Sequence, residues 1–191
     1  MAYDLTTLGW KAFQDLASAV AAEVLRRPVQ TFLGSRDGGR DAAFLGTWDG
    51  GTNGTLKSTI QVKYIGGAGA RLTLSKLSGE LDKVEALVTD GLAEDYVVIT
   101  NAGVTGVSEA AICKAFEAKG VKTCRVYHGD WIIEQIKASA QLRMLVPRVY
   151  GIGDLSHIVT AHAQEQAKAI LAEMGDDLAC FVPTSSYHAA V

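Results

Sequence analysis

Hydrophobic and polar positions recur along this chain in two periods, and the switch between them marks its elements. From about Thr7 to Leu25 the apolar residues follow the spacing of a helix, which Pro28 ends. The run from Val29 to Gly34 has the composition of a short strand. The chain is therefore predicted to begin with a helix and a strand. The predicted apolar stripe of the helix includes Leu8, Leu16, Val20 and Val24.

Two β-prone runs follow, DAAFLGTW over 41–48 and TLKSTIQVKYI over 55–65, with the turn residues DGGTNG between them. This pattern predicts an antiparallel hairpin. Because successive side chains of a strand point to opposite faces, one set is predicted in the core and the other on the opposite face. The core set is Ile60, Val62 and Tyr64, and the opposite set is Thr59, Gln61 and Lys63.

Helix and strand patterns alternate beyond residue 75. Ser75, Ser108 and Asp130 are the predicted N-caps of three helices. Strand, helix and strand at this spacing need a parallel crossover. We therefore expect an α/β fold, a sandwich with a mixed central β-sheet flanked by helices. The predicted elements are helices over Ser75–Ala93 and Ser108–Lys119, strands over Tyr96–Thr100 and Val121–Tyr127, and a helix from Asp130.

The pattern changes beyond Leu142. The run RMLVPRVYGIGDL carries one proline and two glycines and is predicted to be irregular. The residues Ser156–Met174 again have the pattern of a helix. We therefore expect a domain over residues 1–150, followed by a helical extension over 151–191 that leads toward a downstream domain.

The composition excludes several classes of protein. With 191 residues, of which 48% are hydrophobic, the chain can bury about 70% of the surface that its unfolded form exposes, which excludes disorder and collagen. Its three cysteines fit neither a disulfide framework nor a CxxC metal site. The first residues, MAYDLTTLGW, contain neither a basic n-region nor an apolar h-region. We therefore expect a soluble, cytoplasmic protein with no membrane span.

Charge is distributed unevenly along the chain. The net charge of −3 argues against a uniformly basic surface for nucleic acid. The glycine-rich segment Gly34–Lys76 nevertheless contains six lysines and arginines against three aspartates, a balance that suits contact with phosphates. A pair of solvated loops is the alternative interpretation. The cations predicted to hold a DNA backbone are Arg36, Arg40, Lys57 and Arg71.

Candidate chemistry lies on the predicted hairpin. Asp41 begins the first run, so pairing of the two runs could set it beside Gln61 and Lys63. A carboxylate and an amide oxygen are hard-oxygen ligands for Mg²⁺, and the lysine supplies a neighbouring cation. Such a site can activate water for attack on a phosphodiester. In the alternative interpretation, Lys63 extends its ammonium to solvent and Gln61 bonds across the sheet.

Three short motifs resemble one superfamily of nucleases. FQDL at 13–16, GGRDA at 38–42 and IQVKY at 60–64 are similar, in this order, to the motifs of the PD-(D/E)XK superfamily. They are most similar to Mrr-type restriction endonuclease domains with Q-x-K in place of E-x-K. The resemblance extends from about Leu8 to Ile136. It implies a restriction-endonuclease-like fold and an endonuclease that cleaves DNA with Mg²⁺ or Mn²⁺.

The resemblance also implies roles for individual residues. Asp41 matches the aspartate that binds metal, Gln61 matches the second acidic position, and Lys63 matches the motif lysine. The Val62 carbonyl would be a further metal ligand. Asp41, Gln61 and Lys63 are thus the expected catalytic residues.

The chain departs from the family pattern at three positions. No proline precedes Asp41, Gln61 replaces a charged ligand, and Gln14 stands where many relatives have a glutamate. The site would therefore carry less negative charge than its relatives do. Glu23 could compensate, because the helical period places it on the buried face of the first helix. An exposed position near the helix end is the alternative for Glu23.

The carboxyl end has a second resemblance. The run ACFVPTSSYHAAV over 179–191 is similar to the segment that precedes the P-loop in STAND-type NTPases of bacterial antiphage systems. This implies an effector domain of antiviral defence with a downstream NTPase. Since a double-strand cut needs two active sites, a homodimer or higher homo-oligomer is expected. The alternatives are a catalytically inactive nucleic-acid-binding module and an interaction module of a larger ATPase.

Overall fold

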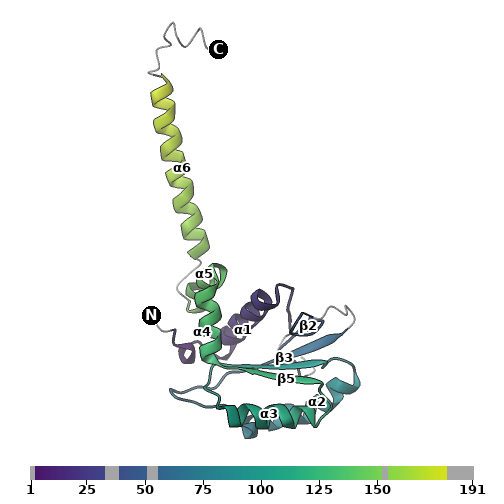
Figure 1. Ribbon diagram of the computed structural model, residues 1–191. Helices are drawn as coiled ribbons and strands as arrows, with labels where there is room; N and C mark the ends of the chain where they lie inside the picture. Colours follow the sequence, from purple (N-terminus) through teal and green to yellow (C-terminus); the bar gives the residue numbers. More distant parts are fainter. Residues whose placement is uncertain (1–2, 33–38, 51–55, 152–154, 180–191) are drawn as a thin grey trace. The chain divides into compact units, whose positions relative to one another are not determined.

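The chain divides into two compact units. The computed structural model describes residues 3–32, 39–50, 56–151 and 155–179. The units are Met1–Ile152 and Gly153–Val191, and the division lies two residues beyond the boundary expected at residue 150. The first unit is an α/β domain in which helices lie on both sides of a mixed β-sheet (Figure 1).

The sheet has five strands in the order β1-β2-β3-β4-β5. The first three strands pair antiparallel, and β3, β4 and β5 pair parallel. The predicted hairpin and the predicted parallel crossovers are therefore both confirmed. The strands are β1 (Gln30–Thr31), β2 (Ala42–Leu45), β3 (Lys57–Lys63), β4 (Asp95–Thr100) and β5 (Thr123–Tyr127).

Helices cover both faces of the sheet (Figure 1). One face packs against α1, α4 and α5, and the other packs against α2 and α3. Short 3-10 helices precede α1 and α2. The described helices of this unit are η1 (Leu5–Thr7), α1 (Gly9–Leu25), η2 (Leu74–Leu77), α2 (Ser78–Thr89), α3 (Gly106–Glu117), α4 (Gly129–Ala138) and α5 (Ala140–Val149).

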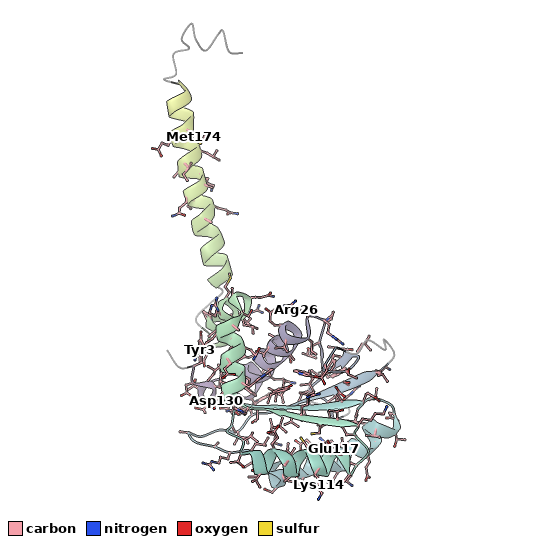
Figure 2. The ribbon with its side chains drawn as sticks, in the orientation of Figure 1. Tyr3, Arg26, Lys114, Glu117, Asp130 and Met174 are labelled. Carbon is pink, nitrogen blue, oxygen red and sulfur yellow. The ribbon has the colours of Figure 1, made fainter. Side chains whose placement is uncertain are left out.

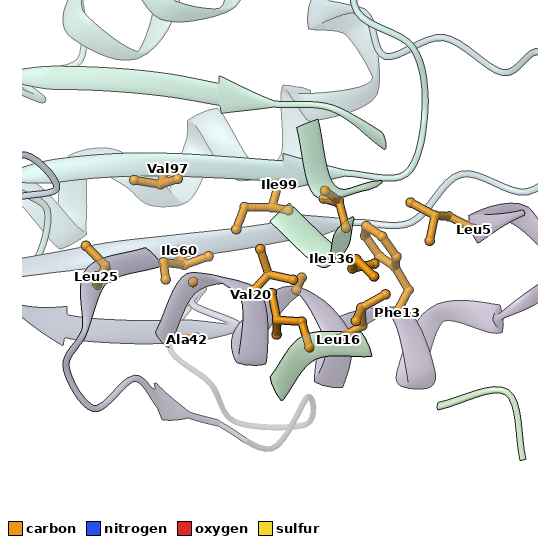
Figure 3. Close-up of a cluster of buried hydrophobic side chains, with 14 of the residues drawn as sticks. Leu5, Phe13, Leu16, Val20, Leu25, Ala42, Ile60, Val97, Ile99 and Ile136 are labelled. Atoms are coloured by element: carbon orange, nitrogen blue, oxygen red, sulfur yellow. The ribbon is translucent and has the colours of Figure 1, made fainter. Parts of the chain in front are cut away.

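The first hydrophobic core lies between the sheet and α1, α4 and α5 (Figure 3). Phe13 and Val20 of α1 and Ile60 of β3 are completely buried in it. Burying a side chain of this size contributes about 1.5–3 kcal/mol to folding. Val62 and Tyr64 pack against the same core, which confirms the core set predicted for β3.

The second core lies between the opposite face of the sheet and the helices α2 and α3. Tyr96 of β4 stacks on Phe116 of α3, with ring centroids 4.6 Å apart. All residues of β4 are buried, because this central strand is covered on both faces. The buried strand predicted from the run YVVIT is thus confirmed.

The buried stripe of α1 differs from the predicted one at its end. Leu16 and Val20 are completely buried, but Val24 is 37% exposed and Leu25 takes the buried place instead. The helix ends after Leu25 because Arg26 adopts a left-handed conformation with a φ of 50°. Its N–H then bonds to carbonyls of the last turn.

The predicted N-caps are wrong at all three positions. The helix α2 starts only at Ser78, so Ser75 lies in the preceding 3-10 helix. The cap of α3 is Thr105, whose side chain accepts a hydrogen bond from the Ser108 N–H at 3.2 Å. Asp130 lies in the first turn of α4, where its charge suits the positive end of the helix dipole.

Residues 143–149, which were predicted to be irregular, are helical. Ser139 caps α5 by accepting a hydrogen bond from the Leu142 N–H at 3.2 Å. Leu142 and Val146 are then buried in the first core. Pro147 lies inside the helix near its end, where the missing N–H removes a single backbone hydrogen bond. Burial of the apolar face therefore outweighs the local effect of the proline.

The second unit contains α6 (Leu155–Ala179), a helix of 25 residues that extends beyond both ends of the predicted one. The side chains described in it, over 163–175, are all exposed. Met174 is an example at 55% exposure (Figure 2). Among the helices described, α6 included, none is both long enough and apolar enough to cross a membrane.

Candidate functional site

Strand register brings Asp41 next to Gln61. Ala42 of β2 pairs with Ile60 of β3, and both side chains belong to the first core. Gln61 therefore lies on the other face of β3. Asp41 directly precedes β2 opposite Gln61, and its carboxylate meets the Val62 backbone N–H beside β3. Lys63 lies two residues further along the same face of β3.

The Asp41 carboxylate is held by three nitrogen donors. The Val62 backbone N–H donates to its Oδ2 at 2.7 Å, and the Gln14 side chain donates to its Oδ1 at 3.3 Å. The Gln61 amide nitrogen also donates to Oδ2. Hydrogen bonds to an ionised acceptor are the strong ones. They fix the carboxylate in place between α1 and β3.

Gln61 is fixed at both ends of its amide. Its nitrogen bonds to Asp41, and its oxygen accepts a hydrogen bond from the Tyr96 hydroxyl at 3.4 Å. Gln61 thus does bond across the sheet, as one interpretation of the sequence had it, and its partner there is Asp41. The two residues form one polar unit. Sequence reasoning missed Tyr96, which carries no signal beyond its place in a β-branched run.

Lys63 points to a carboxylate rather than only to solvent. Its Nζ lies 2.7 Å from Glu80 Oε1, and the two side chains are 30% and 14% exposed. Glu80 belongs to the first turn of α2. Sequence reasoning missed this partner, because an acidic residue at a helix start is ordinary and only the packing of α2 on the sheet brings it to Lys63.

Two buried polar residues fix the end of β3 that carries Lys63. The Thr100 hydroxyl donates to the Lys63 carbonyl at 2.7 Å. The Asn101 side chain accepts from the Ile65 N–H at 2.8 Å and donates to the Ile65 carbonyl at 2.9 Å. Both follow from β4 running parallel to β3. The backbone that carries Lys63 is therefore rigidly placed.

Gln14 and Glu23, both on α1, have different partners. Gln14 contacts Asp41, as described above, and is only 5% exposed. Glu23 instead accepts a hydrogen bond from the Ser139 hydroxyl at 2.7 Å, at the junction of α4 and α5. Nine residues of α1 separate the two side chains, or about 13 Å of helix. Gln14 therefore contacts the candidate site, whereas Glu23 joins α1 to the junction of α4 and α5.

The predicted DNA-binding cations do not all lie together. Arg40 and Lys57 line one groove over β1, β2 and β3. Arg71 is exposed and pairs with Gly103 in a short parallel bridge after β4. Arg36 lies outside the described residues. Two of the four cations therefore line a common groove, Arg40 next to Asp41 in the chain and Lys57 at the far end of the pairing, opposite Leu45.

The donor set suits Mg²⁺ in kind but is low in charge. No group of three or more His, Cys, Asp or Glu side chains gathers within the described parts of the chain. Asp41 offers one carboxylate, and turning the Gln61 amide by half a rotation would present its oxygen in place of its nitrogen. The Val62 carbonyl leaves β3 on the same side as the N–H that meets Asp41. Because Mg²⁺ commonly keeps several waters, these three oxygens fit it.

Comparisons with known proteins identify no relative of this chain. No family model matches it, and neither a curated protein nor a solved structure matches it. The resemblance to PD-(D/E)XK nucleases therefore rests on the short motifs alone.

Proposed function

We propose that this protein is a metal-dependent endonuclease that hydrolyses phosphodiester bonds in DNA. The observation that supports this most is the contact of Asp41 with Gln61, with Lys63 two residues further along the same half-buried face of β3. An acidic and an amide ligand with a lysine beside them can serve phosphoryl chemistry. We further propose that the fold is restriction-endonuclease-like, on the strength of the motif order.

Asp41, Gln61 and the Val62 carbonyl would hold Mg²⁺ or Mn²⁺. When bound, the ion would lower the pKa of a coordinated water and polarise a phosphoryl oxygen. The chain's own contribution is to orient these oxygens. Gln14 and the Val62 N–H hold the carboxylate from two sides, so it cannot rotate freely.

Lys63 would stabilise the charge that develops on the phosphate as the water attacks. The ion pair with Glu80, at 2.7 Å, holds its ammonium against α2 in the absence of substrate. A phosphate oxygen would then share or replace this carboxylate partner. Glu80 is thus assigned as a positioning residue for Lys63.

The wider biological role is proposed from the motifs. Arg40, Lys57 and Arg71, with Arg36, would contact the DNA backbone. A homodimer or higher homo-oligomer would supply two sites for a double-strand cut. The domain would act as an effector of antiviral defence, joined through α6 to a downstream NTPase.

A second candidate is a catalytically inactive nucleic-acid-binding module. Its support is that Asp41 is already occupied by three nitrogen donors and that Gln61 brings no charge. The carboxylate then serves to bind β3 to β2 and α1, and the site needs no ion. The cations Arg40 and Lys57 would keep their role in either case.

Nicking of supercoiled plasmid DNA separates the two candidates. The wild-type chain should nick the plasmid with Mg²⁺ or Mn²⁺ and should stop when EDTA is added. Lys63→Ala should lower the rate at least about a hundredfold. Lys114→Ala is the matched control, because Lys114 is exposed on α3, away from the sheet (Figure 2). DNA binding without metal-dependent nicking would favour the inactive module.

A further inference from the structure

A groove of about 450 Å³ lies over β1, β2 and β3, next to the candidate site. Its lining includes Ala43 and Leu45 of β2, the strand that Asp41 directly precedes. Ala43 follows Asp41 by two residues, which is about 7 Å along a strand. The groove therefore begins within one nucleotide length of the carboxylate.

The lining combines apolar walls with cations. Leu45 is 57% exposed, and Leu92 from the loop before β4 also lines the groove. Arg40 and Lys57 supply two positive charges, and no aspartate or glutamate is among the described lining residues. Pockets of this size and composition accept a small ligand. This lining suits an anionic group joined to a flat apolar one.

Arg40 has an unused hydrogen-bond donor. Its guanidinium lies over the Phe32 ring, 4.6 Å from the centroid. Its Nε is buried and has no hydrogen-bond partner within the described structure. A buried polar atom of this kind calls for a partner. A phosphate oxygen would provide one once the Arg40 side chain turns to expose this atom.

A nucleotide fits this groove better than a peptide strand does. A peptide would add to the edge of the sheet, but the edge strand β1 has only two residues to pair with. A base would lie against the apolar walls while phosphates on either side of it along the strand meet Lys57 and Arg40. A base that is stacked and paired within a duplex cannot enter such a groove.

We propose that the groove receives an unpaired nucleotide of the substrate strand, so that the protein engages single-stranded or locally opened DNA. The inference rests on the proposed function, because it takes the Asp41 site as the place of the scissile phosphate. It adds the substrate class and assigns Leu45, Leu92, Arg40 and Lys57 to recognition of the nucleotide.

Binding without metal tests this inference apart from cleavage. A labelled single-stranded oligonucleotide is titrated with the full chain in EDTA, and its fluorescence anisotropy is followed. An abasic oligonucleotide of equal length has the same charge without the bases. Wild type should bind the strand with bases about fivefold more tightly than the abasic one, because only the former fills the apolar walls.

Two variants assign the effect to the groove. Leu45→Ala should reduce the preference for bases to below about twofold, while Lys57→Gln should weaken binding of both strands. Val107→Ala is the matched control, since Val107 is 83% exposed at the start of α3. Circular dichroism checks that each variant is folded.

Several outcomes overturn the inference. Equal affinity for the two strands in the wild type, an unchanged preference in Leu45→Ala, or a preference for duplex DNA would each do so. Displacement of the strand by poly-glutamate as readily as by unlabelled DNA would assign the groove to acidic peptides. If the protein prefers strands with bases but nicks no plasmid, the nucleotide-binding role of the groove is supported and the endonuclease activity is rejected. If the protein nicks the plasmid but shows no preference for bases, the endonuclease activity is supported and the nucleotide-binding role of the groove is rejected.

Discussion

The two faces of β3 serve different purposes. On one face, Ile60 is completely buried and Val62 packs beside it in the first core. On the other face, Gln61 and Lys63 are only half-buried, and their polar partners come from α2, β4 and the residue before β2. The same strand therefore carries a packing surface and a polar surface, one residue apart.

The polar face of β3 is the less favourable of the two faces for folding stability. Removing a polar group from water is unfavourable unless a hydrogen bond replaces the lost solvent. Gln61 and Lys63 have such replacements, but an apolar pair in their place would pack the second core without needing them. The polar face of β3, whose side chains bond to Asp41, Glu80 and Tyr96, is therefore the part of the sheet at which to test for catalytic activity.

The largest expected effect is on the apolar face. Phe13→Ala should lower the free energy of unfolding by about 3–5 kcal/mol, because it leaves a cavity in a completely buried part of the core. Urea denaturation measures this loss. The cleavage rate per folded molecule should stay near that of the wild type, and a large loss of that rate would show that the two faces are not independent.

Removing the central carboxylate should affect both chemistry and stability. Asp41→Ala should lower plasmid nicking at least about a hundredfold, since a metal ligand is lost. It should also lower the free energy of unfolding by about 1–3 kcal/mol, because the donors from Gln14, Gln61 and Val62 lose their acceptor. Nicking assays and urea denaturation measure the two losses. Loss of stability with unchanged nicking would make Asp41 purely structural.

The Gln61→Glu change tests the charge of the polar face. A carboxylate at this position cannot donate to Asp41, so the two negative charges repel until a cation lies between them. Metal binding should become about tenfold tighter, and Mg²⁺ should raise the melting temperature of this variant more than that of the wild type. Calorimetry and thermal unfolding measure these changes. Identical metal affinity in both proteins would exclude Gln61 from the site.

The smallest effect is expected for the two cysteines of the second core, Cys113 and Cys124, and concerns their reactivity. Burial raises the pKa of the Cys124 thiol. It also raises the pKa of the neighbouring Cys113 thiol, which is less buried. Both thiols therefore stay neutral in the folded protein at pH 8, and their reaction with a disulfide reagent should be slow until urea unfolds the chain. Fast reaction of both in the native state would mean that α3 opens readily from β5.

The same raised pKa values set a direction with pH. The thiols of the unfolded chain ionise from about pH 8.5, whereas those of the folded chain keep their protons. Stability is therefore fully present below that pH and falls as the pH rises above it. Serine at both positions should remove this part of the alkaline loss, which urea denaturation at pH 8 and pH 10 would measure.

Local patterns in the sequence already determined much of this fold. The alternation along β3, the hairpin with β2 and the buried run of β4 follow from side-chain geometry that a strand imposes on its own residues. The approach of Asp41 to Gln61 also follows, because the pairing of Ala42 with Ile60 sets the preceding residue opposite Gln61. These features depend on a few neighbouring residues.

Only the tertiary structure decided the rest. Gln14, Glu80 and Tyr96 meet their partners across 27, 17 and 35 residues of chain. No local pattern specifies these meetings, since they depend on how α1, α2 and β4 pack on the sheet. The helix α5 likewise forms around Pro147 because the core buries its apolar face. Spacing along the chain thus determines which face a side chain takes, whereas burial and packing determine what it meets there.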